Sequence, residues 1–240
     1  KRRLLERIRA TGKPLGDYVQ GRFYRGILTG LNEAFVIDGA TRARLIAEDP
    51  KSAEIIKPFL RGRDVKRWRV EFANQYLIKI ESSENKQHPW SSKKGAEAEA
   101  VFANTHPVIH AHFQNYRQAL IDRYDQGKFF WELRACVYWQ EFEKPKIIVP
   151  AIAEEPSFAS DFFSYFSNNK STIFIPPSVN FALGVLNSSI NAWFATQVCS
   201  TKQGGFFDFE PRYSGQLIMP VSNIQQQTLI EATVAAILAP

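Results

Sequence analysis

The sequence predicts an α+β fold, in which a mixed β-core carries helices packed around it. The composition, 240 residues with 45% hydrophobic and 22% charged residues, is typical of a folded domain and excludes disordered and collagen-like chains. Short apolar segments such as KIIVP at 146–150 are typical of strands. Between Val108 and Tyr124 apolar residues recur three and four positions apart, which indicates an amphipathic helix that ends at Gly127.

The same reasoning assigns the remaining elements in chain order. Leu4, Leu5 and Ile8 have helical spacing, and that pattern ends at Gly12. Thr41 and Ser52 are expected to cap the helices that they begin. Strands are expected at 21–30, 32–38, 75–80, 146–150, 171–176 and just before Pro220. Helices are expected at 41–49, 52–60, 107–127 and 224–237, and the segment 178–198 is expected to become helical after about Phe181. An exposed loop is expected at 81–95.

Residues 21–30 and 32–38 are expected to form a hairpin punctuated by Gly26 and Gly30. Because the chain begins without Met, we expect residues 1–14 to be the end of a helix, or a linker, from a missing upstream part. Residues 15–240 are expected to form one domain.

Two further features of the composition limit the setting. Cys136 and Cys199 are the two cysteines, too few for a disulfide framework, which favours a reducing, cytoplasmic environment. No apolar run approaches the roughly 18 to 20 residues that span a bilayer, so no membrane segment is expected. Oligomeric state cannot be read from these features.

The positive charge is concentrated near the start of the chain. Residues 1–70 contain 17 Lys and Arg against 8 Asp and Glu, whereas residues 71–240 contain 13 against 16. A local surplus of this kind is typical of a surface that faces a polyanion. The alternative is a solvated basic face without a partner.

Sequence signatures of catalysis are largely absent. The chain has no glycine-rich cofactor turn, nucleophile elbow or HExxH motif. His106, His110 and His112 lie on one predicted helix but lack acidic or cysteine neighbours to complete a metal shell, so partly buried polar residues are the favoured interpretation. Asp64 with the Glu84–Lys86 triplet fits a metal-dependent nuclease pattern that also arises by chance. We therefore assign no catalytic residue and no metal ligand.

Polar and aromatic residues in turn-rich segments are candidates for contact with nucleic acid. One group surrounds a glycine-bounded turn, and a second forms the basic stretch 57–69, where such density favours phosphate binding. A third lies in the WELR block, where a structural Glu-Arg arrangement is an equal alternative, and a fourth stands beside Gly204, where Phe206 and Phe207 could equally be core. The candidates are Arg25, Thr29, Asn32, Arg61, Arg63, Lys66, Arg67, Trp131, Arg134, Lys202 and Gln203.

Several blocks resemble one family. The blocks are GILTGLNEAFVID, TRARLIAEDPKSAEIIKPFLRGRDVKRW, WELR, KPKIIVP, LGVLNSSINAWF and QLIMP. Together they are similar to the TaqI-like C-terminal specificity domain of type IIG restriction-modification enzymes and adenine-specific DNA methyltransferases. The resemblance extends from about residue 15 to the end. It implies a target recognition domain that grips double-stranded DNA while a separate domain methylates a flipped adenine.

The resemblance also implies what this chain lacks. The family's catalytic N-P-P-[YF] motif does not occur here, so the chain itself is expected to be non-catalytic and to hold no cofactor. S-adenosylmethionine is expected in an upstream methyltransferase domain in cis. Two other functions stay open, namely a protein-interaction or scaffold domain with a basic face, and a metal-dependent nuclease.

Overall fold

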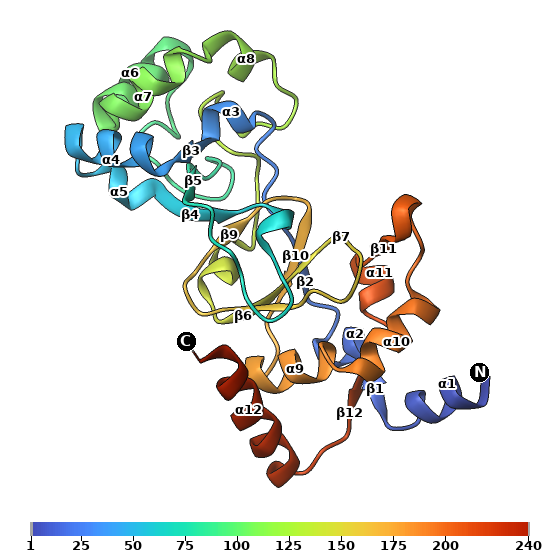
Figure 1. The fold of residues 1–240 in the computed structure, drawn as a ribbon. Helices are drawn as coiled ribbons and strands as arrows, with labels where there is room; N and C mark the ends of the chain where they lie inside the picture. Colours follow the sequence, from blue (N-terminus) through green and yellow to red (C-terminus); the bar gives the residue numbers. More distant parts are fainter. Residues whose placement is uncertain (1, 240) are drawn as a thin grey trace. The chain divides into compact units, whose positions relative to one another are not determined.

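The structure is a computed structural model that describes residues 2–239. The chain forms two compact units (Figure 1). Unit 1 contains the chain up to Gly26, the segment Leu60–Glu71 and the chain from Gln140 onward. Unit 2 contains Ile27–Phe59 and Phe72–Trp139. Helices and antiparallel strands occur in both, so the predicted α+β class is confirmed.

Unit 1 is built on an antiparallel sheet whose strands lie in the order β2-β10-β6-β8. One of the two central strands, β6, is buried along its whole length, which explains the apolar run Ile147–Val149 within it. Two short antiparallel pairs, β1 with β12 and β7 with β11, also belong to this unit. The bounds are β1 Gly12–Pro14, β2 Phe23–Arg25, β6 Lys146–Pro150, β7 Ile152–Ala153, β8 Ala159–Asp161, β9 Phe166–Ser167, β10 Ser171–Phe174, β11 Phe207–Asp208 and β12 Ile218–Pro220.

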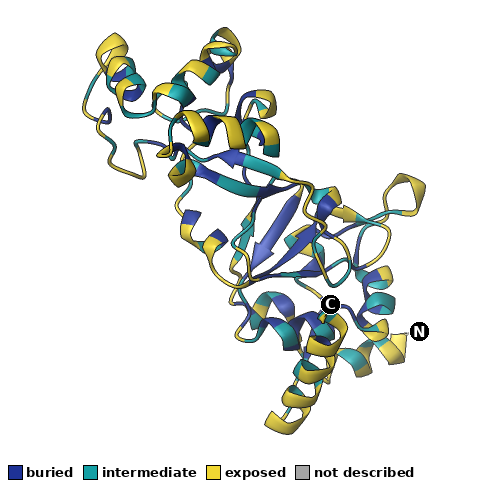
Figure 2. Cartoon of the chain, turned by 60° about the vertical axis from the view of Figure 1, so that its left-hand side comes forward, coloured by how far each residue is buried: buried dark blue, intermediate teal, exposed yellow. Residues whose placement is uncertain are grey.

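Helices pack against this sheet around an apolar core. The 15-residue helix α12 lies against α9 through Ile230 and Val234, and its outer face is exposed in Figure 2, where the sheet strands are buried. Ser178 and Ser188 cap α9 and α10. The bounds are α1 Arg2–Arg9, α2 Leu15–Tyr18, η1 Gly62–Asp64, η2 Trp139–Glu143, α9 Val179–Leu186, α10 Ser189–Val198, η3 Gln203–Gly205, α11 Pro211–Ser214 and α12 Ile224–Leu238.

Unit 2 combines a small sheet with a group of helices. Its strands lie in the order β3-β5-β4, all antiparallel, with Leu77 opposite both Val36 and Lys57. A cluster of aromatic rings that includes Phe102, Phe113 and Trp131 fills its interior. The bounds are α3 Asn32–Phe35, β3 Val36–Asp38, α4 Gly39–Glu48, α5 Ser52–Ile55, β4 Ile56–Leu60, β5 Gln75–Ile78, α6 Gly95–Thr105, α7 Pro107–Gln114 and α8 Arg117–Asp122.

The predicted hairpin between 21–30 and 32–38 is wrong. Strand β2 ends at Arg25 and pairs with β10, while β3 pairs with β5. At Gly26 the backbone runs so close to Asn168 that a Cβ atom would lie 1.9 Å from its carbonyl oxygen. Residues 32–35 form the short helix α3 instead of the start of a second strand.

Three helix predictions need correction. The helix expected at 52–60 ends at Ile55, because β-branched Ile55 and Ile56 and then Pro58 favour the extended strand β4. The long helices expected at 107–127 and from about Phe181 to 198 are each two helices, α7 with α8 and α9 with α10. Helix α6 was not predicted.

The two predicted caps are also wrong. Asp38 caps α4 by accepting a hydrogen bond from the backbone N–H of Thr41 at 2.7 Å. Lys51 holds the cap position of α5, with Ser52 as its first helical residue. Within residues 2–239 no helix has the length and apolar character needed to cross a lipid bilayer.

Candidate nucleic-acid interface

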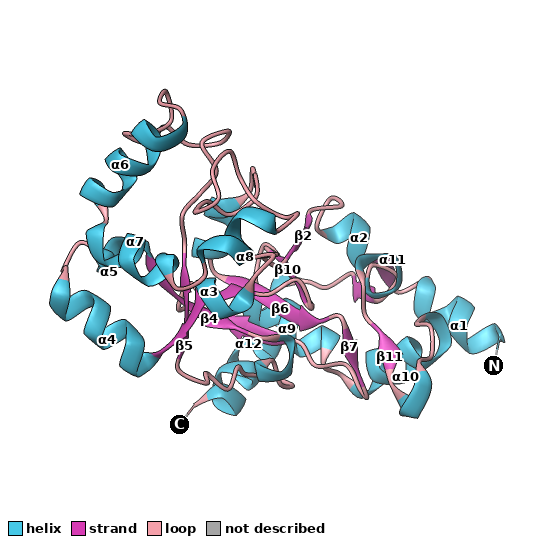
Figure 3. Ribbon diagram, turned by 90° about the horizontal axis from the view of Figure 1, so that it is seen from above, coloured by secondary structure: helices cyan, strands magenta, loops and turns pink. Residues whose placement is uncertain are grey.

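Unit 1 contains a groove of about 840 Å³ whose wall carries more positive than negative charge. The lining residues come from segments far apart in the sequence, including the end of β2, the turn after β4, and strands β7 and β11. Strands β7 and β11 pair with each other and run side by side in Figure 3. Seven basic side chains line it against four acidic ones. They are Arg25, Arg61, Arg63, Lys66, Lys170, Lys202 and Arg212, and Glu154, Glu155, Asp208 and Glu210.

The basic turn, residues 60–71, forms one side of this wall and is fixed at several points. The Gly62 N–H donates to the Asn168 side-chain oxygen at 3.1 Å, and the Trp68 N–H donates to the Phe158 carbonyl at 2.8 Å. Val65 and Val70 pair as an antiparallel bridge. The turn therefore presents its side chains from a fixed backbone.

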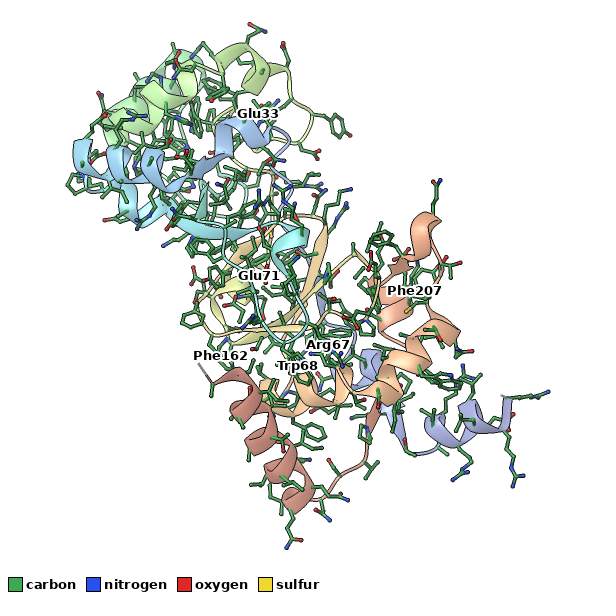
Figure 4. The ribbon with its side chains drawn as sticks, in the orientation of Figure 1. Glu33, Arg67, Trp68, Glu71, Phe162 and Phe207 are labelled. Atoms are coloured by element: carbon green, nitrogen blue, oxygen red, sulfur yellow. The ribbon has the colours of Figure 1, made fainter. Side chains whose placement is uncertain are left out.

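The basic residues of the turn have different roles. The Arg61 guanidinium donates twice to the Asp64 carboxylate, at 3.0 and 2.9 Å, which raises the pKa of Arg61. The Arg67 guanidinium donates to the Asn187 carbonyl at 2.6 Å and lies over the Trp68 ring, beside which it is labelled in Figure 4. Both residues therefore brace the fold.

Three other lining cations are available to a ligand. Arg63, Lys66 and Lys170 are exposed, and no residue between 2 and 239 holds these side chains in a hydrogen bond or an ion pair. Because their charges are not neutralised locally, these three are the strongest candidates for phosphate contact.

Asp208 organises a second pair of cations in the groove. Its carboxylate oxygen Oδ2 lies 3.2 Å from the Lys202 ammonium and 3.2 Å from the Arg212 guanidinium. Burial alone would raise the pKa of Asp208, but the Glu210 N–H, Lys202 and Arg212 outweigh it and lower the pKa. Since one oxygen holds both cations, their nitrogen atoms are at most 6.4 Å apart, a gap that one phosphate can bridge with hydrogen bonds of about 2.9 Å.

The loop that precedes β11 is a defined turn. Gly204 and Gly205 have φ values of 81° and 83°, the left-handed region that favours glycine. Phe206 lines the groove, whereas Phe207, labelled in Figure 4, packs against the apolar core of unit 1. Gln203 is exposed, is not among the lining residues, and its predicted role in reading bases stays a prediction.

The structure places four other candidates, Thr29, Asn32, Trp131 and Arg134, in unit 2. Thr29 is 3% exposed, and its hydroxyl donates to the Asn32 side-chain oxygen at 2.7 Å, which is ordinary turn chemistry. Arg134 is half-exposed and pairs with Asp125 at 3.2 Å. Only Arg25, Arg61, Arg63, Lys66 and Lys202 of the predicted set line the groove.

The first two residues of the WELR block, Trp131 and Glu132, are buried in unit 2. Trp131 is 2% exposed and stacks on Phe102 and Phe129, so its ring does not reach a ligand. The fully buried Glu132 carboxylate accepts from the Ser83 N–H at 3.0 Å and from the Trp90 indole at 2.9 Å. Thus the expected exposed loop 81–95 is anchored inward by a buried Trp90.

The metal-binding alternatives find no support. His110 Nε2 lies 3.0 Å from Glu99, and His112 Nε2 lies 2.9 Å from the Ala34 carbonyl oxygen. The Asp64 carboxylate, which belongs to the nuclease pattern, forms an ion pair with Arg61. Across the described part of the chain, no three His, Cys, Asp or Glu side chains gather in a way that could hold a metal ion.

Sequence reasoning missed the lining residues Lys170, Arg212 and the β7 segment. Lys170 stands alone in a polar turn, and Arg212 follows Glu210 and Pro211, so neither forms part of a basic run. Strand pairing places these segments at the groove, since β10 and β6 bring Ser171 opposite Pro150, and β7 and β11 bring Ile152 opposite Asp208. Local sequence patterns do not predict that pairing.

Comparison with known proteins finds a family model that matches most of the chain. The family model of the TaqI-like C-terminal specificity domain matches residues 57–217. No curated protein sequence matches the chain.

Two solved structures have a similar fold. One is the type IIL restriction-modification enzyme MmeI in complex with DNA, with a TM-score of 0.63 and 10% identity over 90% of this chain and 27% of that one. The other is the type IIG restriction endonuclease BpuSI, with a TM-score of 0.55 and 12% identity over 97% of this chain and 28% of that one. The chain thus spans just over a quarter of the length of either neighbour.

Proposed function

Because the chain belongs to the family of TaqI-like C-terminal specificity domains, we propose that it recognises sequence in double-stranded DNA through the basic groove of unit 1. The observation that supports this most strongly is the set of unpaired cations, Arg63, Lys66 and Lys170, on one wall. Cations without local counter-ions gain most from phosphate, because each contact releases condensed counterions from DNA.

We further propose that the chain works as the specificity module of a larger DNA adenine methyltransferase or type IIG restriction-modification enzyme, linked in cis to its catalytic domain. The solved neighbours, MmeI and BpuSI, are restriction-modification proteins several times longer than the matched segment. In this arrangement the groove selects the site, and a separate domain carries out the chemistry.

Salt dependence tests DNA binding by the groove. We expect the affinity for duplex DNA to fall with a log–log slope of at least about 3 in magnitude, roughly 0.9 for each neutralised phosphate. Arg63→Ala should reduce that slope by about 0.9. Fluorescence anisotropy with a labelled duplex at several salt concentrations measures both.

Arg69→Ala is the matched control, because Arg69 is exposed in the same turn but does not line the groove. It should leave the slope unchanged. If Arg63→Ala folds normally and keeps the wild-type slope, Arg63 does not contact phosphate. A wild-type slope near zero would instead favour a scaffold domain that meets a partner other than DNA.

The absence of cofactor-binding motifs gives a second test. The chain has no glycine-rich cofactor turn and no N-P-P-[YF] motif, so we expect no binding of S-adenosylmethionine and no methyl transfer. Calorimetric titration of the chain with S-adenosylmethionine is sufficient. Heat that saturates at micromolar concentration would show that part of the cofactor site lies within these residues.

A further inference from the structure

One acidic side chain in the groove differs from the other three. Asp208 holds Lys202 and Arg212, Glu210 lies 3.4 Å from Arg212, and Glu155 lies 3.7 Å from Arg67. Glu154 also lines the groove and is exposed, yet no side chain or backbone group in the described chain pairs with it. Its negative charge is therefore not neutralised by the protein.

An unpaired carboxylate is unfavourable on a surface that binds phosphate. It repels the DNA backbone, and as an acceptor it cannot hydrogen-bond to phosphate oxygens, which are acceptors too. The groups of DNA that can satisfy a carboxylate are the amino donors on base edges. In the major groove cytosine presents its N4 amino group, whereas adenine places the acceptor N7 beside its N6 amino group. Cytosine is therefore the better partner for a carboxylate.

The strand that precedes Glu154 has a second feature unsuited to phosphate. Ile152 on β7 lines the groove and is 54% exposed, although its side chain offers phosphate no hydrogen bond. An apolar side chain suits base edges, where the thymine methyl group lies. β7 pairs antiparallel with β11, and a two-stranded ribbon fits the width of the major groove.

We propose that Glu154 is a specificity-determining residue whose carboxylate accepts a hydrogen bond from the N4 amino group of one cytosine in the recognised sequence. The inference rests on the proposed function, because it requires duplex DNA in the groove. Lys202 and Arg212, which share the Asp208 carboxylate, are close enough together to hold one phosphate beside this strand pair. Glu154 then reads one base pair.

The test compares Glu154→Ala with Glu155→Ala, an adjacent exposed glutamate whose carboxylate faces Arg67. Each chain is incubated with a library of randomised duplexes, and the bound duplexes are sequenced. We expect the wild type and Glu155→Ala to select the same motif. Glu154→Ala should lose the preference for C·G at one position, by about 5-fold to 150-fold relative to the other pairs, while the remaining positions keep theirs.

A second readout separates base reading from general binding. Removal of a repelling charge should leave the affinity of Glu154→Ala for an unrelated duplex unchanged or higher at low salt, the opposite of the effect of Arg63→Ala. Thermal unfolding should match the wild type, because Glu154 has no partner to lose.

The outcomes are distinct. If the wild type selects a motif and Glu154→Ala selects the same one, the assignment of Glu154 is wrong and the proposed function stands. If the altered position is not C·G in the wild-type motif, the assignment to cytosine is wrong. If the wild type selects no motif, the proposed function fails and the assignment with it.

Discussion

Replacing Asp161 by alanine is expected to destabilise unit 1 by about 3 to 5 kcal/mol. Asp161 and Lys146 form an ion pair at 2.5 Å in which both side chains are fully buried. Burial lowers the pKa of the Lys146 ammonium, and the Asp161 carboxylate opposes that effect. Without the carboxylate, the buried ammonium keeps its hydrogen bond to the Phe142 carbonyl but loses the ion pair.

Asp161 also holds the chain that follows β8. Its two oxygens accept the N–H groups of Phe163 at 2.7 Å and Tyr165 at 2.9 Å. The double variant Lys146→Met with Asp161→Leu removes both charges but leaves these two amides unsatisfied. We expect it to recover part of the lost stability, since an apolar pair often replaces a buried ion pair at little cost.

Urea unfolding followed by circular dichroism measures these changes. Lys144→Met is the matched control, because Lys144 pairs with Glu141 at 2.7 Å but is half-exposed. It should change the free energy of unfolding by less than about 1 kcal/mol. A loss below about 1 kcal/mol for Asp161→Ala would mean that the pair is solvated in solution.

Glu132→Leu is expected to destabilise unit 2 by at least about 3 kcal/mol. The Glu132 carboxylate is fully buried and accepts hydrogen bonds from Ser83, Trp90 and Phe129. Leucine fills a similar volume but leaves the Trp90 indole N–H and the Ser83 N–H without acceptors, and each buried unsatisfied donor costs about 1 to 3 kcal/mol.

Intrinsic tryptophan fluorescence during urea unfolding follows this change, and Arg134→Ala is the control. Arg134 belongs to the same WELR block but pairs with Asp125 near the surface, so its loss should cost less than about 1 kcal/mol. If Glu132→Leu is as stable as the wild type but selects a different DNA motif, Glu132 reads bases and the structural interpretation is wrong.

Elements whose signal is local could be predicted from the sequence. The apolar run 146–150 is the buried strand β6, and the 224–237 pattern is helix α12 at Ile224–Leu238. The predictions that failed depended on tertiary context. Residues 56–60 are extended because β4 pairs with β5, and the regular apolar spacing through 107–127 gives no indication that the helix breaks at Asn115 and Tyr116.

The same contrast between local sequence signal and tertiary context applies to the residues of the candidate site. The density of charge at 61–67 identified Arg63 and Lys66, which line the groove. Density could not separate them from Arg61 and Arg67, whose guanidinium groups are held within the fold by Asp64 and by the Asn187 carbonyl. That distinction depends on which acceptors tertiary structure brings near each side chain.

The division into two units has a consequence for dissecting this protein. The chain passes between units four times, so neither unit is a continuous stretch of sequence. The groove turn at 61–66 belongs to unit 1 but is flanked on both sides by unit 2 segments ending at Phe59 and starting at Phe72. No single start or stop codon can isolate the groove, and exchanging one loop between homologues moves only one side of it. Transplanting specificity therefore requires exchange of the whole two-unit chain or point substitutions within the groove.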